Sequence, residues 1–501
     1  MNFLTRHKQQ LFLAATFIVG SFLSFFHIGK KNLALDEVAS YIFTANWSEM
    51  INTLYYHEGN MWLYYVLLNL WRTIGESDGI MRSLSALFAI VTLPVVYLLG
   101  KSLFTNHIAR ITTLLLSVNV FFIFNAQSLR SYSLLLLLTT LAEYIFVLYT
   151  KNYTITKKIS LKRAILLYLV PLTFLNILSI YSHLYSLLVI GAQGTSLLLT
   201  KSKKAIAAYS ASFLISITAS IPLFTSPAVT THPINWIETP TIKNLIGTFI
   251  ILSGDFLPIA AILGFVIGYA LFQSRKYSWE TIVDLSNWPV LFIFISLFFP
   301  IIASFTFSLF VKPMYVSMYF LICLVPFLFL ASISLGHIKK KLVYQSILVV
   351  IMLFSAIRLY GWYTEDTRLQ LVIYNKYKDW EGTARILAEK SSSNHAIVYY
   401  PPYLETIIHL YYTDDIQLKS GVHEVALQSK ADLQRPGSYA FDSEAVSALP
   451  DTYQTVWYVS PEYSDQNRAD QQQFIESTLK TNYTSTETYH VSGITIERYE
   501  R

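Results

Sequence analysis

Long apolar stretches separated by short polar turns recur from residue 11 to about residue 360 of the chain. Each stretch approaches the roughly 20 residues that an α-helix needs to cross a bilayer. The pattern therefore predicts about eleven membrane-spanning helices and an all-α polytopic membrane domain. The expected spans are 11–29, 80–100, 108–125, 130–149, 164–182, 184–200, 205–226, 250–273, 287–310, 314–336 and 342–361.

One apolar and aromatic stretch, residues 61–71, is too short to cross the membrane comfortably. It predicts an amphipathic helix that lies in the outer membrane interface. We therefore expect residues 30–79 to form a first extracytoplasmic loop with interfacial helices, inside a transmembrane domain that covers residues 1–361.

Beyond about residue 362 the chain becomes polar, and short helical and alternating patterns replace the long apolar stretches. This part, residues 362–501, is expected to form a small soluble extracytoplasmic α/β domain. Its expected helices are 379–390, 403–412 and 466–479, its expected strands are 396–400 and 455–459, and a hairpin is expected at 485–499.

Composition and charge agree with a membrane protein. Apolar residues make up 53% of the chain and charged residues only 14%, whereas soluble proteins carry about 25% charged residues. The net charge of +6 comes from basic residues in alternate loops, which indicates cytoplasmic loops and not a nucleic-acid surface. These residues are Lys101, Arg110, Lys151, Lys157, Lys158, Lys162, Arg163, Lys201, Lys203, Lys204, Arg275, Lys276, Lys339, Lys340 and Lys341. With an odd number of spans, the amino terminus is then cytoplasmic and the carboxyl-terminal domain extracytoplasmic.

The only cysteine, Cys323, falls inside an expected span, which excludes an intrachain disulfide and a cysteine zinc site.

The first candidate for chemistry is the pair Asp36 and Glu37, about seven residues after the first span. Ionisable residues at the edge of the hydrocarbon are costly and mark functional sites. A carboxylate there can act as a general base on an acceptor hydroxyl or bind a divalent cation beside a phosphate. A solvated loop pair is the alternative interpretation.

Further candidates lie at other turns on the expected outer side. Arg130 follows Gln127 and precedes Tyr132, and an arginine matches a phosphate with two parallel hydrogen bonds. His183 lies between two spans, and the pair His57 and Glu58 precedes the expected interfacial helix. Each candidate also has an alternative interpretation. Arg130 could be a snorkelling arginine, His183 a structural histidine, and the pair His57 and Glu58 part of a plain turn.

Four motifs in this order resemble one family. They are the stretches 35–37 (LDE), 63–71 (LYYVLLNLW), 81–88 (MRSLSALF) and 127–134 (QSLRSYSL). They are similar to the bacterial branch of the dolichyl-phosphate-mannose protein mannosyltransferase clan. This clan of C-type (GT-C) membrane glycosyltransferases also includes the aminoarabinose transferase of lipid A. The similarity is strongest over residues 30–200 and is only architectural in the tail.

The resemblance implies transfer of a hexosyl or pentosyl group from a polyprenyl-phosphate donor, on the extracytoplasmic side, with inversion at the anomeric carbon. It implies that Asp36 is the catalytic base and that Glu37 assists it. No cofactor is firmly implied, although a divalent cation at Glu58 and His183 stays open. The residues expected to bind the donor phosphate or the substrates are Arg130, His183, Tyr132, Gln127, His57, Glu58, Tyr64 and Lys312.

The chain departs from the family pattern at three places. Met61 and Trp62 stand where many relatives have two prolines, and Gln127 stands where many have glutamate. Met318 stands before Tyr319, at a position where relatives often have arginine. A phosphate contact from this position is therefore in doubt.

Two other functions are compatible with the same pattern, a transporter or flippase of lipid-linked sugars and a non-catalytic subunit for envelope assembly. The expected partners are a polyprenyl-phosphate-linked sugar, the lipid bilayer, and an acceptor that is a glycan, a lipid or a protein. No nucleic acid is expected.

Overall fold

The computed structural model describes residues 3–230, 237–274, 287–365, 378–427, 441–461 and 469–501. The chain divides into two compact units, each described here by itself. The first contains Met1–Gly29 and Ser40–Ile373, and the second contains Lys30–Ala39 and Tyr374–Arg501. The expected basic loop at Arg275 and Lys276, and the start of the helix expected at residue 466, lie outside the described residues.

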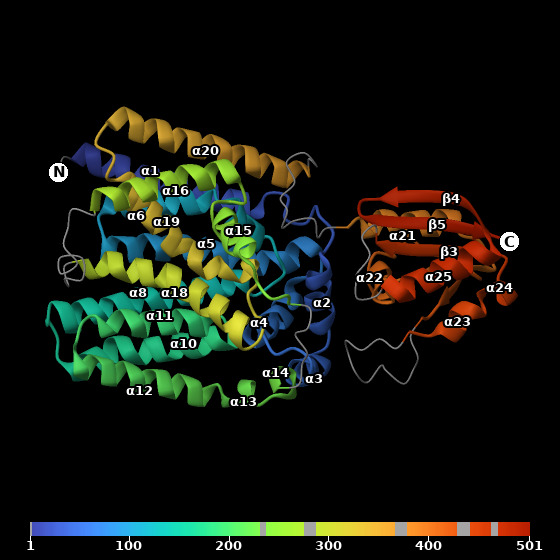
Figure 1. Ribbon diagram of the computed structural model, residues 1–501, viewed down its shortest axis with the longest axis horizontal. Helices are drawn as coiled ribbons and strands as arrows, with labels where there is room; N and C mark the ends of the chain where they lie inside the picture. The colour runs from blue at the N-terminus through green and yellow to red at the C-terminus, as the bar shows by residue number, and fades with distance from the viewer. Residues whose placement is uncertain (1–2, 231–236, 275–286, 366–377, 428–440, 462–468) are drawn as a thin grey trace. The chain divides into compact units, whose positions relative to one another are not determined.

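The first unit consists of membrane helices. Among the described residues, six helical segments are long and apolar enough to cross a bilayer. They are α5 (Asp78–Leu103), α8 (Tyr132–Tyr149) with η2 (Thr150–Ile155), α9 (Leu161–Ala164) with η3 (Ile165–Leu169) and α10 (Val170–Ser182), α18 (Trp288–Phe310), η5 (Ser317–Cys323) with α19 (Leu324–Leu335), and α20 (Lys341–Thr364). Helices α8, α10 and α18 run side by side with α11 (Ser186–Leu198) and α12 (Lys203–Ala219) (Figure 1).

Two further spans are bent pairs of helices. α6 (Asn106–Ser117) and α7 (Val120–Ala126) meet at 62°, and α15 (Ile242–Leu252) and α16 (Leu257–Ser274) meet at 91°. Asn119 joins the two breaks, since its side chain accepts from the Phe121 N–H at 2.9 Å and donates to the Leu252 carbonyl at 3.0 Å. One buried amide thereby satisfies backbone groups that a broken helix leaves unpaired inside a membrane.

The structure confirms the polytopic all-α fold with a small carboxyl-terminal sheet. Counting each bent pair as one span gives up to eight spans among the described residues, against the eleven expected. Of the three expected spans outside this count, the first corresponds to α1, and the other two form helices that are shorter than a span. α11 has 13 residues and α12 has 17.

The segment between α1 (Phe3–Phe25) and α5 contains three short helices, α2 (Leu35–Phe43), α3 (Trp47–Tyr56) and α4 (Trp62–Trp71). α4 covers the helix expected at 61–71 and buries Tyr64, Tyr65 and Leu68 on one face. α3 begins where the Asn46 side chain accepts from the Ser48 N–H at 2.9 Å. The helices expected in this segment are therefore present, and their position at the membrane interface stays a prediction.

The second unit is a mixed five-stranded sheet with the strand order β2-β1-β3-β5-β4. β1 (His395–Tyr399) pairs in parallel with β2 (His423–Val425) and β3 (Thr455–Pro461). β5 (Ile494–Glu500) pairs antiparallel with β3 and with β4 (Thr484–Val491). The expected α/β fold, its two inner strands and its terminal hairpin are present, and β2 is a strand that the sequence pattern did not indicate.

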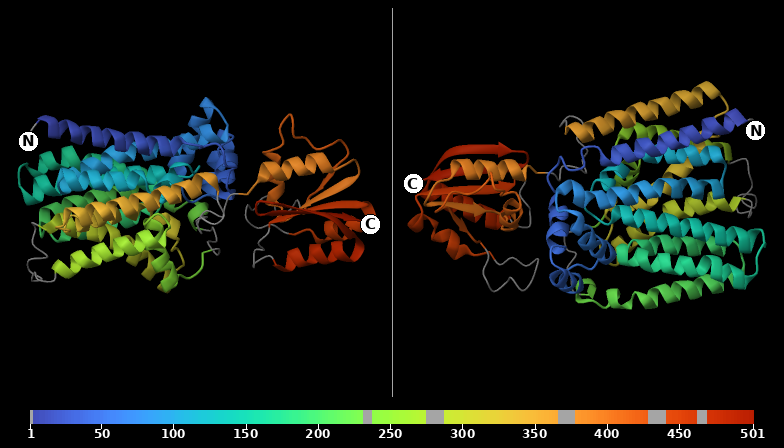
Figure 2. Two further views of the ribbon diagram at one scale, coloured as in Figure 1. Left: turned by 90° about the horizontal axis from the view of Figure 1, so that it is seen from above. Right: turned by 180° about the vertical axis from the view of Figure 1, so that it is seen from behind.

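Helices cover both faces of this sheet. Figure 2 shows α21 (Trp380–Lys390) on one face and α25 (Ala469–Asn482) on the other. The shorter helices of this unit are α22 (Tyr403–His409), α23 (Ser443–Ser447) and α24 (Leu449–Thr452). Ile475 and Leu479 of α25 pack against Val398 and Val456 in one apolar cluster.

Replacing Leu479 with alanine should destabilise this unit by about 2–5 kcal/mol, because it removes fully buried methyl groups from that cluster. Thermal unfolding of the purified full-length protein, followed by proteolysis of the carboxyl-terminal unit, measures the effect. Gln473→Ala, at an exposed position of the same helix, should melt like the unchanged protein. If Leu479→Ala melts at the same temperature as the unchanged protein, the packing of Leu479 in this cluster is contradicted.

Candidate active site around Arg130

Arg130 lies in the tight turn between α7 and α8. Its guanidinium donates to Ser40 Oγ at 3.2 Å and to the Tyr65 hydroxyl at 3.3 Å. Its carbonyl accepts from Ser85 Oγ at 3.2 Å, and Ser85 in turn shares a hydrogen bond of 2.8 Å with the Tyr64 hydroxyl. Side chains from α2, α4 and α5 therefore hold both ends of this half-buried arginine.

His183 is buried between α10 and α11. Its Nδ1 accepts from the Tyr185 N–H at 3.2 Å, so the proton of the neutral ring is on Nε2. Burial, with a smaller contribution from the positive charge of Arg130, lowers the pKa of His183 to about 3. At neutral pH the ring is therefore an uncharged donor through Nε2.

Three tyrosine rings surround His183. Its ring centroid lies 4.8 Å from that of Tyr319, 5.5 Å from that of Tyr185 and 6.0 Å from that of Tyr132. Tyr132 and Tyr319 are 5.8 Å apart. The rings come from α8, η5 and the turn before α11, and together they form an aromatic wall with polar edges, which is suited to sugars and amphipathic ligands.

Glu58 joins this group through Asn60. Its carboxylate accepts from the Asn60 N–H at 3.1 Å, and Asn60 Oδ1 accepts from the Leu184 N–H at 3.3 Å. Burial raises the pKa of Tyr65, the negative charge of Glu58 raises it further, and the positive charge of Arg130 opposes both. The structure thus brings Glu58, Arg130 and His183 into one region of the first unit.

Asp36 and Glu37 both lie in the first turn of α2, a helix that the division between the two units crosses. Glu37 is buried, and its carboxylate accepts from the Ala34 N–H at 2.8 Å, which is half of a capping box. Asp36 is half-buried and precedes Ser40 by four residues on the same helix. The two neighbouring carboxylates therefore have different surroundings.

The other expected residues make different contacts. The Gln127 amide donates to the Phe26 carbonyl at 2.8 Å and accepts from Trp362 Nε1 at 2.9 Å, so it fastens the end of α1 to α20. His57 ends α3 and packs beside the Tyr56 ring at 6.2 Å. Lys312 is exposed directly after α18.

Tyr65, Ser40 and Tyr319 are among the residues around the site that were not singled out from the sequence. Tyr65 contacts the Arg130 guanidinium while its neighbour Tyr64 contacts Ser85. Ser40 accepts from Arg130, and the Tyr319 ring makes an edge-to-face contact with His183. The only sequence signal for Tyr319 was its place beside Met318, where the family pattern differs, because the contacts themselves depend on tertiary packing.

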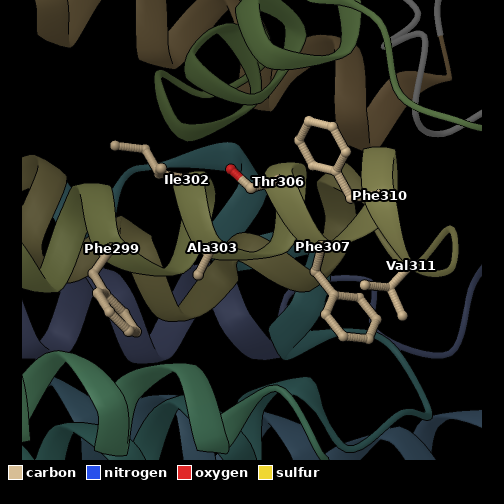
Figure 3. Close-up of a pocket in the computed structure, with 7 residues that line it drawn as sticks. All are labelled: Phe299, Ile302, Ala303, Thr306, Phe307, Phe310 and Val311. Carbon is tan, nitrogen blue, oxygen red and sulfur yellow. The ribbon is translucent and has the colours of Figure 1, made fainter.

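A separate apolar groove of about 530 Å³ lies along the end of α18. In Figure 3, Ile302, Thr306 and Phe310 project to one side of the helix and Phe299 and Phe307 to the other. Thr306 supplies the single side-chain hydroxyl of this lining. The groove therefore suits hydrocarbon chains and offers no charged partner for a phosphate.

No protein-family model and no curated protein matches the sequence. Solved structures match it in fold. ArnT from Cupriavidus metallidurans in the apo state is 12% identical, with 99% of this chain and 98% of that chain covered at a TM-score of 0.58. The same protein bound to undecaprenyl phosphate is 11% identical, with 97% of each chain covered at a TM-score of 0.59.

The oligosaccharyltransferase from Archaeoglobus fulgidus in the apo form is 11% identical. It matches 92% of this chain and 70% of its own length at a TM-score of 0.50. ArnT and this oligosaccharyltransferase are GT-C glycosyltransferases, so the expected GT-C fold is confirmed over nearly the whole chain.

Acidification should reveal the buried neutral state of His183. Its folded-state pKa is depressed, so its contribution to stability is complete above the ordinary histidine value of about 6.5 and is lost as the pH falls toward about 3. The loss is at most about 1.4 kcal/mol per pH unit. Between pH 6.5 and 5.0, the melting temperature should therefore fall less for His183→Gln than for the unchanged protein. His337→Gln, at an exposed histidine, is the control, and parallel pH curves for all three proteins would disprove the assignment.

Proposed function

We propose that this protein is an inverting glycosyltransferase that moves a hexosyl or pentosyl group from a polyprenyl-phosphate donor to an acceptor hydroxyl. The observation that carries the proposal is the Arg130 guanidinium, held beside an uncharged His183 ring within one tyrosine-rich cluster of a membrane domain. The GT-C fold supports it, because ArnT, which shares this fold, binds undecaprenyl phosphate.

Arg130 and His183 are the proposed phosphate-binding residues. Arginine keeps its charge in any protein environment and can donate two parallel hydrogen bonds to one phosphate. His183 adds a neutral donor through Nε2, since its Nδ1 is already bonded to the Tyr185 N–H. Both residues are suited to stabilise a phosphate that gains negative charge as the sugar departs.

Asp36 is the proposed general base. Its carboxylate takes the proton of the acceptor hydroxyl while that oxygen forms a bond to the anomeric carbon. The bond between this carbon and the phosphate oxygen breaks on the opposite side, and the lipid phosphate leaves as an anion, so the configuration inverts. Glu37 is assigned a positioning role, because its carboxylate already accepts from the Ala34 N–H at the start of α2.

The position of Asp36 within α2 supports this role. Residues four apart lie on the same face of a helix, so Asp36 shares a face with Ser40, whose hydroxyl accepts from Arg130.

A divalent cation at Glu58 and His183 stays a prediction. A metal bound through Nε2 would require the proton on Nδ1, whereas Nδ1 accepts from the Tyr185 N–H in this structure. This arrangement favours His183 as a phosphate donor. Transfer should then survive removal of metal ions.

The proposal places the amino terminus in the cytoplasm and the carboxyl-terminal unit outside the cell membrane. The alternation of basic loops along the sequence supports this orientation. The acceptor is a glycan, a lipid or a protein. Its recognition is assigned to the segment from residue 30 to 79 and to the carboxyl-terminal unit.

Asp36→Asn should reduce transfer by about 10²- to 10⁴-fold at normal expression, because an amide cannot accept the proton of the acceptor hydroxyl. Mass analysis of envelope glycans, in cells that lack the protein and express each variant, measures the loss. Glu37→Gln is the matched control, since glutamine can still accept from the Ala34 N–H. We expect that variant to retain most of the transfer.

The same variant separates the competing functions. A flippase or an assembly subunit does not need a general base, so full glycan modification with Asp36→Asn would overturn the proposed role of Asp36. Loss of modification with Asp36→Asn, together with normal folding, supports the transferase.

Arg130→Ala should weaken binding of undecaprenyl phosphate by about 10- to 100-fold, the value of a lost hydrogen bond to a charged group. Native mass spectrometry of the detergent-solubilised protein with this lipid measures the change. Arg72→Ala is the control, because the Arg72 guanidinium donates to Glu76 at 2.8 Å and to the Tyr41 carbonyl at 2.7 Å. Equal binding by both variants would remove Arg130 from the phosphate site.

A further inference from the structure

The carboxyl-terminal unit holds a second group of ionisable residues, far from the membrane site in sequence. Glu405 and His409 lie on α22, and Glu424 lies on β2. One ligand atom from each residue lies within 4.8 Å of the other two, and among the described residues this is the group of three with metal-binding spacing. Glu405 and His409 are four residues apart, which puts both on one face of the helix.

The contacts of Glu424 hold its carboxylate toward the histidine. Its two oxygens lie 2.9 Å and 2.8 Å from His409 Nε2. Tyr399, on the adjacent strand β1, donates to Glu424 Oε1 at 2.7 Å, and its hydroxyl also lies 3.3 Å from that of Tyr412. A buried tyrosine that orients a carboxylate is the kind of outer partner that metal ligands commonly have.

The group carries excess negative charge yet remains open to solvent. Burial and the charge of Glu424 raise the pKa of Glu405, and only His409 opposes them among the causes of the shift. The His409 side chain is 46% exposed and that of Glu424 is 20% exposed, so an ion can reach both. A divalent cation would offset the repulsion between the two carboxylates.

We propose that Glu405, His409 and Glu424 bind one divalent transition-metal ion of the zinc type. One imidazole and two carboxylates are three ligands that such an ion accepts, with water in the fourth position. Calcium is disfavoured because it takes six to eight oxygen ligands, and magnesium because it prefers oxygen ligands in an octahedral arrangement.

The ion would fasten the edge of the sheet. β2 has three residues and pairs only with β1 at the edge of the strand order. A metal bound to α22 and β2 would add a link across this weak edge, which stabilises the folded unit because metal binding energy contributes to folding. The role is structural and does not depend on the proposed sugar transfer.

The test uses untagged full-length protein in detergent, stripped with chelator and titrated with Co²⁺, whose visible absorption reports a site of mixed nitrogen and oxygen ligands. We expect one equivalent of Co²⁺ to bind and Zn²⁺ to displace it. Zn²⁺ should also raise the melting temperature of the carboxyl-terminal unit. His409→Ala should weaken Co²⁺ binding at least tenfold. Glu424→Gln should do the same, and glutamine can still accept from Tyr399, so its folding should be preserved.

Two controls make the outcome specific. His423→Ala alters a histidine next to Glu424 that projects to the opposite face of β2 and packs beside Tyr453, and it should bind Co²⁺ normally. His183→Gln removes the other candidate metal ligand and should also leave this equivalent intact. Unchanged Co²⁺ binding in both His409→Ala and Glu424→Gln, or absence of Co²⁺ binding by the unchanged protein, would show that the group is only an ion pair.

Discussion

A guanidinium at the ends of membrane helices must be solvated by the protein, because it does not lose its charge. The Arg130 guanidinium donates to the hydroxyl groups of Ser40 and Tyr65, and Ser85 holds the backbone carbonyl of the same residue. These hydroxyl partners are neutral, and the carboxylate of Glu58 is close enough to influence Tyr65. The positive charge of Arg130 also helps to keep His183 uncharged.

The same demand for internal solvation explains the breaks in the membrane helices. A helix that ends within the membrane exposes backbone groups that lipid cannot satisfy. Asn119 and Gln127 supply the missing partners, the first where α7 and α15 meet and the second at the end of α1. Both side chains are polar residues inside apolar stretches. Asn119 stands at the start of α7 and Gln127 at its end, and the turn that carries Arg130 follows within a few residues.

Hydropathy alone predicts the membrane domain, the change to an α/β domain near residue 362 and most elements of that domain, because burial in lipid and burial in a core leave different periodicities. It does not predict the breaks at residues 118–119 and 253–256. Asn119 caps the helix after the first break, and the same side chain reaches the second break from a distant part of the sequence. Arg130, His183 and Glu58 were found from charge at helix ends. Tyr65 and Tyr319 were not, because their contacts with Arg130 and His183 depend on tertiary packing.

Asp36 and Glu37 illustrate how one local interaction separates two equivalent residues. At the third position of α2, Glu37 reaches back to the Ala34 N–H, and burial leaves little room for another role. Asp36, one position earlier, is half-buried. A carboxylate at the first turn of a helix is stabilised in its charged form by the helix dipole. The first turn of α2 therefore gives Glu37 a structural hydrogen bond, and the proposed proton transfer is assigned to Asp36.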